Sequence, residues 1–200
     1  MVKKTVGILL FNEVEVLDFA GPYEVLSLAA PPEERDNHFF HVVTVSETGK
    51  QIRARNGLTV KPDYSFVDYP YLDIVIVPGG YGAETTELTN QNVITWIKEQ
   101  AAHTELIASV CTGALLLAKA GLLDSKAATT HWMDVDRLEA EFPLVSVKRG
   151  VKFVDEGRII TSAGISAGID MSFHILTRLY GVNATADTAK SMEYEIKLED

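Results

Sequence analysis

Short apolar runs that end in turn residues alternate along this chain with stretches of helical periodicity, and this alternation restricts its fold more than any other feature. Residues 73–77, Asp-Ile-Val-Ile-Val, are almost entirely apolar, which is typical of a strand covered on both faces. Strands that alternate with helices favour a parallel sheet with crossover helices over an antiparallel sandwich. We therefore predict an α/β fold with a mostly parallel sheet between helices.

The same patterns place the individual elements. Strands are expected at 6–11, 39–45, 73–77, in the run before Cys111, and in three shorter runs at 145–151, 152–154 and 158–161. Helices are expected at 21–29, 90–102, from Cys111 to Ala120, and at 166–180. Pro22 suits the first turn of the first of these helices, and Gly121 suits the end of the third.

Composition limits the class of protein. With 200 residues, of which 46% are hydrophobic, the chain is long enough to bury a substantial core, and we expect one domain over residues 1–200. A net charge of -10 with scattered lysines and arginines argues against a nucleic-acid partner. The longest uncharged stretch, 106–118, is shorter than the roughly 20 residues of a membrane span. A single cysteine and no recognisable targeting signal in residues 1–11 indicate the reducing cytoplasm.

Cys111 lies where an apolar strand runs directly into a helical pattern, within residues 105–118. A side chain at such a sharp strand-to-helix turn is held close to the unpaired first amides of the helix. These amides and the positive end of the helix dipole favour thiolate over thiol, which predicts a nucleophile with a lowered pKa. The alternative is that Cys111 is buried and packs as a small hydrophobic side chain.

Loops that follow parallel strands meet at the carboxyl edge of the sheet, and two more of these loops carry groups suited to chemistry. Asp18 lies between apolar neighbours, so a buried carboxylate there requires a partner or a raised pKa. Its alternative role is to cap the N-terminus of the following helix. Gly79 and Gly80 follow the strand at 73–77, and their amides form either an anion-stabilising hole or simply a turn.

Thr112 and His131 are further candidates. Thr112 either caps the helix backbone or donates its hydroxyl to the reacting centre. His131 is the best placed of the five histidines to pair with Cys111 as a general base, although a histidine flanked by aromatic residues more often satisfies local hydrogen bonds. No second cysteine exists, and His38 and His41 would lie on opposite faces of a strand, so we expect no metal ion.

At these residues the chain resembles the ThiJ/PfpI superfamily, which shares the class I glutamine amidotransferase-like fold. The resemblance covers nearly the whole chain. It is carried by the segments 16–26, 77–80, 109–113, 127–132 and 163–170.

Within the superfamily the chain is most similar to the isonitrile hydratase branch, in which the acid is aspartate, as at Asp18, and threonine follows the nucleophile, as at Thr112. The protease and glyoxalase-like branches carry glutamate at the acid position, and the intracellular proteases have histidine directly after the cysteine. Related transcriptional regulators add a C-terminal helix-turn-helix domain, for which we expect no room in a chain that ends in the acidic segment 193–200.

The resemblance implies a flavodoxin-like three-layer sandwich with a nucleophile elbow at Cys111, and it implies a stand-alone enzyme that forms a homodimer. It implies a small-molecule substrate, no cofactor, and no nucleic-acid or membrane partner. It assigns catalytic roles to Cys111, Asp18 and Thr112, oxyanion or substrate contacts to Gly79, Gly80, Gly113 and Ile165, and an auxiliary role to His131.

The activity implied by the resemblance is that of a hydro-lyase, which hydrates an isonitrile to an N-substituted formamide through a thioimidate on Cys111, with Asp18 supplying a proton. Two alternatives use the same thiol. One is a cofactor-free glyoxalase-like enzyme that acts on α-oxoaldehydes such as methylglyoxal. The other is a non-enzymatic redox sensor or small-molecule-binding protein in which Cys111 is oxidised.

Overall fold

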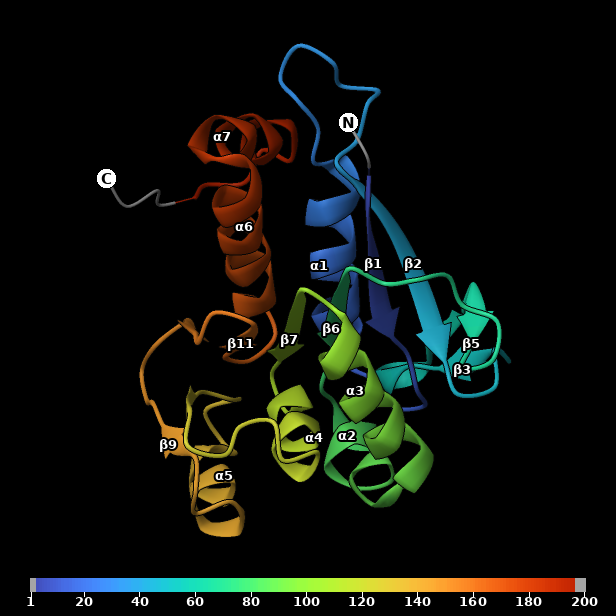
Figure 1. Ribbon diagram of the computed structural model, residues 1–200, viewed down its shortest axis with the longest axis vertical. Coiled ribbons are helices and arrows are strands. Elements are labelled where there is room, and N and C mark those ends of the chain that lie inside the picture. The colour runs from blue at the N-terminus through green and yellow to red at the C-terminus, as the bar shows by residue number, and fades with distance from the viewer. Residues whose placement is uncertain (1–2, 197–200) are drawn as a thin grey trace.

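A seven-stranded sheet forms the centre of the computed structural model, which describes residues 3–196 (Figure 1). Its strand order is β10-β11-β7-β6-β1-β2-β5, and every neighbouring pair is parallel except β10 with β11. The strands are β1 (Lys4–Leu9), β2 (Phe40–Ser46), β5 (Tyr64–Ser65), β6 (Ile74–Val77), β7 (Leu106–Val110), β10 (Phe153–Asp155) and β11 (Ile159–Ser162).

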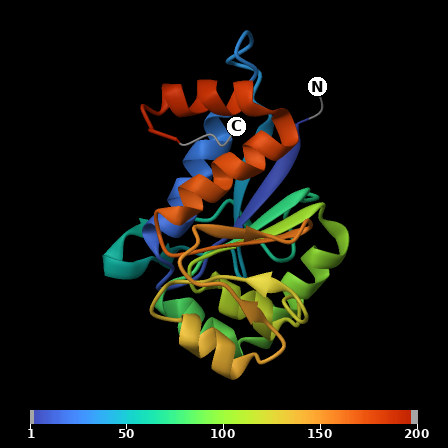
Figure 2. The same ribbon diagram turned by 90° about the vertical axis from the view of Figure 1, so that its left-hand side faces the viewer.

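Helices cover both faces of this sheet, as Figure 2 shows. On one face lie α1 (Val16–Leu28), α6 (Ala167–Tyr180) and α7 (Val182–Ser191), and on the other lie α3 (Gln91–His103) and α4 (Gly113–Lys119). The prediction of a flavodoxin-like three-layer fold with a mostly parallel sheet is therefore confirmed.

The structure also contains small elements, and apart from β9, which lies within the strand expected at 145–151, the sequence patterns did not predict them. Two-stranded sheets pair β3 with β4 and β8 with β9, and the remaining helical pieces are short. Their bounds are β3 (Ile52–Arg53), β4 (Thr59–Val60), β8 (Ala127–Ala128), β9 (Ser146–Val147), α2 (Tyr81–Glu84), α5 (Val135–Glu141), η1 (Arg55–Gly57) and η2 (Glu87–Thr89). The two- to four-residue elements present too few residues for a hydrophobic period to be detected. The longer helix α7 was likewise not predicted.

The two central strands β6 and β7 are buried along their entire length. They run in parallel register, with Val75 opposite Ile107 and Val77 opposite Ser109. Strands buried on both faces are continuous apolar runs, which is why the sequence located them well. They fix the position of the loops that leave their carboxyl ends, including the turn that holds Cys111.

Helix α1 begins at Val16, five positions before the predicted start at Gly21, and Pro22 lies inside it rather than in its first turn. Proline cannot donate a hydrogen bond to the carbonyl of Asp18, one helical turn earlier. The helix nevertheless continues through Pro22, because Val25 and Leu26 pack into the core and secure its second half. The prediction of a strand at 145–151 is also too long, because only Ser146–Val147 pairs with a neighbour.

None of the helices within residues 3–196 is long and apolar enough to cross a membrane.

A substitution of Gly113 tests how closely α4 approaches the sheet. A Cβ atom at this position would collide with the carbonyl oxygens of Val77 and Pro78 at the end of β6. We expect Gly113→Ala to lower the free energy of unfolding by about 1–3 kcal/mol, since backbone on both sides must shift. Denaturant unfolding followed by circular dichroism measures this change. The control is Lys119→Ala, at an exposed position of the same helix, and equal midpoints for the two variants would contradict the prediction.

Candidate functional site

Three loops meet at the carboxyl edge of the sheet and bring Asp18, Gly79 and Cys111 together. One loop joins β1 to α1, one follows β6, and one joins β7 to α4. The backbone amide of Glu15 donates to the carbonyl oxygen of Gly79 at 2.9 Å, which ties the first loop to the second. The amide of Gly80 donates to the hydroxyl of Thr112 at 2.9 Å, which ties the second to the third.

Cys111 occupies the turn between β7, which ends at Val110, and α4, which begins at Gly113. Its φ angle is 56°, in the left-handed region that side chains other than glycine rarely adopt. Its amide donates to the carbonyl oxygens of Ser162 and Ala163, each at 3.2 Å, and the hydroxyl of Thr130 donates to its carbonyl oxygen at 2.8 Å. These bonds hold the residue in its strained conformation, and its side chain is only 5% exposed.

Asp18 lies in the first turn of α1 and is completely buried, with 0% exposure. Its Oδ2 accepts a hydrogen bond from the amide of Gly79 at 3.0 Å. Its Oδ1 has no hydrogen-bond partner among the described residues. The interpretation of Asp18 as a helix cap is wrong, because the residue before α1 is Glu15 and the Asp18 carboxylate turns away from its own helix towards another loop. A buried carboxylate with one open oxygen is costly as an anion and well suited to carry a proton.

Asp18 and Cys111 influence each other's ionisation. Burial, followed by the nearby charge of Glu15, raises the pKa of Asp18 to about 7, against the hydrogen bond from the Gly79 amide and the smaller influence of the nearby Cys111 thiol. Burial and the charge of ionised Asp18 raise the pKa of the Cys111 thiol above its usual range. The prediction of a thiol pKa lowered by the helix terminus is therefore wrong while Asp18 is ionised, since burial and repulsion outweigh the amides.

The groups that favour the thiolate are the amides of Thr112 and Ile165 and the hydroxyl of Thr112, each of which lowers the pKa of Cys111 through a hydrogen bond. Ile165 follows β11 and also has a positive φ, of 52°. Its side chain is 37% exposed although it is large and apolar. The loop after β11 therefore presents a backbone donor to the sulfur and an apolar side chain to the solvent beside it.

The amides of Gly79 and Gly80 already donate to Asp18 and Thr112. Both glycines also allow a close approach of backbones: a Cβ at Gly79 would lie 2.5 Å from the Thr112 nitrogen, and one at Gly80 would collide with Glu15. Their predicted role as anion donors stays a prediction. In this arrangement the Gly79 amide orients the carboxyl group of Asp18, and the Gly80 amide orients the hydroxyl of Thr112.

His131 reaches the edge of the site but not its centre. The edge of its ring packs directly on Gly164, the neighbour of Ile165. Its Nδ1 accepts from the amide of Met133 at 3.4 Å and lies 3.7 Å from the carboxylate of Asp134. No hydrogen bond joins it to Cys111 or Asp18 in residues 3–196, and its auxiliary role stays a prediction.

Glu84, at the end of α2, is a third carboxyl group near the site that the sequence analysis missed. Burial, and then the charge of Asp134, raises its pKa, while a hydrogen bond with the Thr112 hydroxyl opposes this shift. The available signal was its position four residues after Gly80, in the loop already identified. Among the described residues, no group of three or more His, Cys, Asp or Glu side chains is arranged to hold a metal ion.

The raised pKa of Asp18 makes stability depend on pH. The folded protein binds a proton at Asp18 between its unfolded pKa, about 3.9, and its folded pKa, so the wild type loses stability as pH rises through that window. Asparagine does not titrate. We therefore expect Asp18→Asn to gain on the order of 3 kcal/mol relative to the wild type between pH 5 and pH 8. Urea unfolding at both pH values measures this difference. Glu24→Gln, on the exposed face of α1, is the control, and a pH-independent difference between Asp18→Asn and wild type would refute the shift.

Comparison with known proteins supports a relationship over most of the chain. The model of the DJ-1/PfpI family matches residues 4–178. An isonitrile hydratase of Pseudomonas putida is 37% identical over 189 residues, which are 94% of this chain and 78% of that protein. The HTH-type transcriptional regulator GbdR of Pseudomonas aeruginosa is 32% identical over 96% of this chain, which spans only 51% of that regulator.

Solved structures agree on the fold. A ThiJ/PfpI family protein from Pseudomonas syringae superposes with a TM-score of 0.86 at 24% identity, covering 99% of this chain and 78% of that one. DJ-1beta of Drosophila melanogaster superposes with a TM-score of 0.83 at 21% identity, covering 98% of this chain and 100% of that one. Together with the match over residues 4–178, these similarities show that the chain belongs to the DJ-1/PfpI family.

Proposed function

We propose that this protein is an isonitrile hydratase-like lyase, in which Cys111 is the nucleophile and Asp18 is the acid and base. The observation that carries the proposal is the buried pair itself: a cysteine held in a strained turn beside a fully buried carboxyl with one unpartnered oxygen. The similarity to the isonitrile hydratase of Pseudomonas putida supports this chemistry.

The pair holds one proton between two groups that resist being ionised together. When the proton is on Asp18, its charge no longer repels the sulfur. Burial still raises the pKa of the thiol, and the amides of Thr112 and Ile165 oppose this effect of burial. A thiolate beside a neutral carboxylic acid provides a nucleophile and a proton donor at the same time. This is the state that we assign to the reactive enzyme.

In the first step the Cys111 thiolate adds to the terminal carbon of the isonitrile, forming the S–C bond and placing an electron pair on that carbon. Asp18 then gives its proton to the same carbon. The product is a thioimidate, in which the former isonitrile carbon carries hydrogen, sulfur and a double bond to nitrogen. Asp18 is now ionised.

In the second step ionised Asp18 removes one proton from water as the water oxygen attacks the thioimidate carbon. The second proton of that water then passes from the new hydroxyl group to the substrate nitrogen. The tetrahedral adduct collapses, breaks the S–C bond and releases an N-substituted formamide. Cys111 leaves as thiolate, and the proton that Asp18 took from water restores the starting state. The overall reaction consumes one isonitrile and one water.

Substitution of either member of the pair tests the mechanism. We expect Cys111→Ala and Asp18→Asn each to lower kcat by roughly 10³-fold or more, because each removes a group that acts in the transition state. Formamide production from cyclohexyl isocyanide, followed by absorbance and confirmed by mass spectrometry, measures the rates. Intact mass during turnover detects the covalent thioimidate in the wild type.

Lys119→Ala provides the control for handling and folding, because this exposed side chain lies at the far end of α4. Turnover retained by Cys111→Ala would eliminate covalent catalysis. Turnover retained by Asp18→Asn would eliminate Asp18 as the proton donor while leaving the nucleophile in place.

Thr112 gives a sharper test, because its hydroxyl accepts from the Gly80 amide and lowers the pKa of the Cys111 thiol. Thr112→Val keeps the shape of the side chain but removes the hydroxyl, whereas Thr112→Ser keeps the hydroxyl. We expect kcat for the isonitrile to fall about 10-fold to 100-fold in Thr112→Val and to stay within about threefold of wild type in Thr112→Ser. Equal rates in the two variants would show that the hydroxyl has no part in the reaction.

A second candidate is a non-enzymatic protein that binds small molecules or senses oxidants. It is favoured by the relative GbdR, a transcriptional regulator that this chain matches over 96% of its own length. In that case peroxide converts Cys111 to sulfinic acid, and intact mass increases by two oxygen atoms in wild type but not in Cys111→Ser.

The same experiments separate the candidates. Cys111-dependent formamide production establishes the hydratase. Lactate formed from methylglyoxal in its place would establish the α-oxoaldehyde activity, and oxidation of Cys111 without turnover of either substrate would establish the sensor. The homodimer and the cytoplasmic location also stay predictions, and light scattering of the purified chain measures the first.

A further inference from the structure

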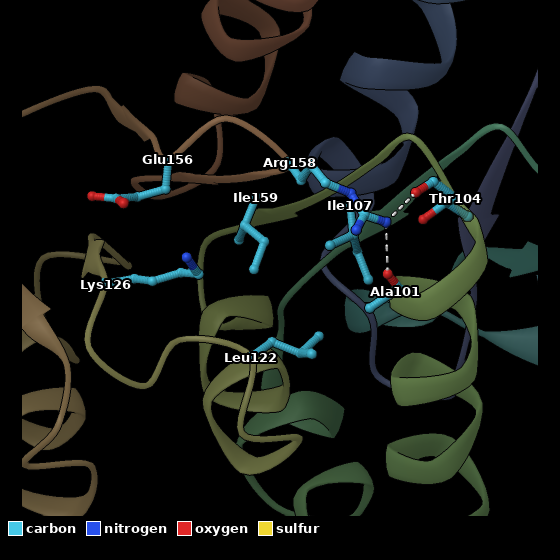
Figure 3. A pocket seen from close by; sticks show the side chains of 8 residues that line it. All are labelled: Ala101, Thr104, Ile107, Leu122, Lys126, Glu156, Arg158 and Ile159. Carbon is cyan, nitrogen blue, oxygen red and sulfur yellow. Dashed lines mark hydrogen bonds between the residues drawn. The ribbon is translucent and has the colours of Figure 1, made fainter.

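A cavity of about 200 Å³ lies near the amino ends of β7 and β11, at the opposite edge of the sheet from Cys111. Figure 3 shows the side chains that line it. Ile107 and Ile159 are paired residues on these two strands, and with Leu122 they form an apolar floor. Lys126 and Arg158 lie at its rim. The cavity shares no lining residue with the site around Cys111.

The two cations at the rim have no acidic partner. Within the described residues, no carboxylate lies within ion-pair distance of Lys126 or Arg158. Glu156 also lines the cavity, but its Oε1 accepts from the amide of Ala127 at 3.1 Å, and Figure 3 shows its carboxylate directed away from the centre.

The side chain of Arg158 is held in position by hydrogen bonds to backbone carbonyl oxygens of other residues. Its Nη2 donates to the carbonyl oxygens of Ala101 at 3.0 Å and Thr104 at 2.7 Å, at the C-terminal end of α3. These bonds leave Nε and Nη1 without a hydrogen-bond partner among the described residues and fix the plane of the guanidinium. A fixed guanidinium plane recognises the two oxygens of a carboxylate better than it recognises a single charge.

We propose that this cavity binds a small carboxylate with an apolar body. The carboxylate would lie between Lys126 and Arg158, and the body would rest on Ile107, Leu122 and Ile159. At about 30 Å³ per water-sized group, the cavity has room for roughly seven such groups, which suits a short aliphatic or simple aromatic monocarboxylate. Isonitriles and formamides carry no charge, so this ligand is distinct from the substrate and product proposed above.

Sodium hexanoate is the probe, with hexanamide as the uncharged analogue of the same shape. We expect hexanoate to shift the methyl resonances of Ile107, Leu122 and Ile159 in a saturable way in carbon-detected NMR spectra of the full chain. Lys126→Ala, whose side chain makes no hydrogen bond in the structure, should weaken binding at least tenfold at unchanged thermal stability. Arg158→Gln is a second variant. Its affinity for hexanoate is interpreted only if its thermal midpoint equals that of wild type, since Arg158 also bonds to the end of α3.

Lys119→Ala is the matched control and should bind hexanoate as the wild type does. Three results would overturn the proposal: unchanged affinity in Lys126→Ala, equal affinity for hexanamide, or shifts confined to residues around Cys111. Equal affinity for inorganic phosphate would overturn the requirement for an apolar body. Because none of these readouts uses turnover, failure of this proposal and failure of the hydratase proposal are distinguishable.

Discussion

Three backbone segments pack closely against one another, and the site depends on this contact. The turn at Gly79 and Gly80 contacts the start of α4 on one side and the start of α1 on the other. Gly113 completes the contact, since a Cβ there would collide with Val77. One backbone hydrogen bond, from Glu15 to Gly79, connects the first two loops, and the Gly79 and Gly80 amides bond to the side chains of Asp18 and Thr112.

This contact explains why a carboxylate can be buried at Asp18. The Gly79 amide satisfies one oxygen, and the other is left open beside the cysteine. The energetic cost of burying the charged carboxylate raises the pKa of Asp18, so this residue takes up a proton more readily than an exposed aspartate does. A strained φ at Cys111 adds to the same cost. Sites of this kind sacrifice stability for chemistry, and the surrounding buried strands β6 and β7 supply the rigidity that maintains them.

The family membership does not by itself choose between catalysis and binding. Relatives of this chain carry the names of an isonitrile hydratase and of a transcriptional regulator, at 37% and 32% identity. A shared fold hosts different functions, and the function depends on the groups at the site. Here the local chemistry includes Glu84, whose hydrogen bond to Thr112 adds a third carboxyl to the surroundings of the sulfur. The charge of that group belongs in any account of how the site titrates.

The sequence by itself determined the class of fold and the order of its central elements, because strands buried on both faces and amphipathic helices have distinct periods. It also proposed Cys111, Asp18, Thr112 and the glycines as candidate site residues, since each lies in or close after a loop that follows a strand. It did not locate the start of α1 or the small strands, because core packing overrides local signals such as Pro22.

Only the tertiary structure decided how these residues act on one another. The direction of the Cys111 pKa shift depends on burial and on the carboxylate of Asp18, which is distant in the sequence. The prediction made from the local helix terminus alone was therefore wrong. Other features of the site also depend on how separate loops lie in space. These are the partners of the Gly79 and Gly80 amides, the packing of His131 on Gly164, and the proximity of Glu84 to Thr112. A sequence gives the residue types and their local conformation, whereas electrostatic energy depends on separation and burial in three dimensions, which only the folded chain establishes.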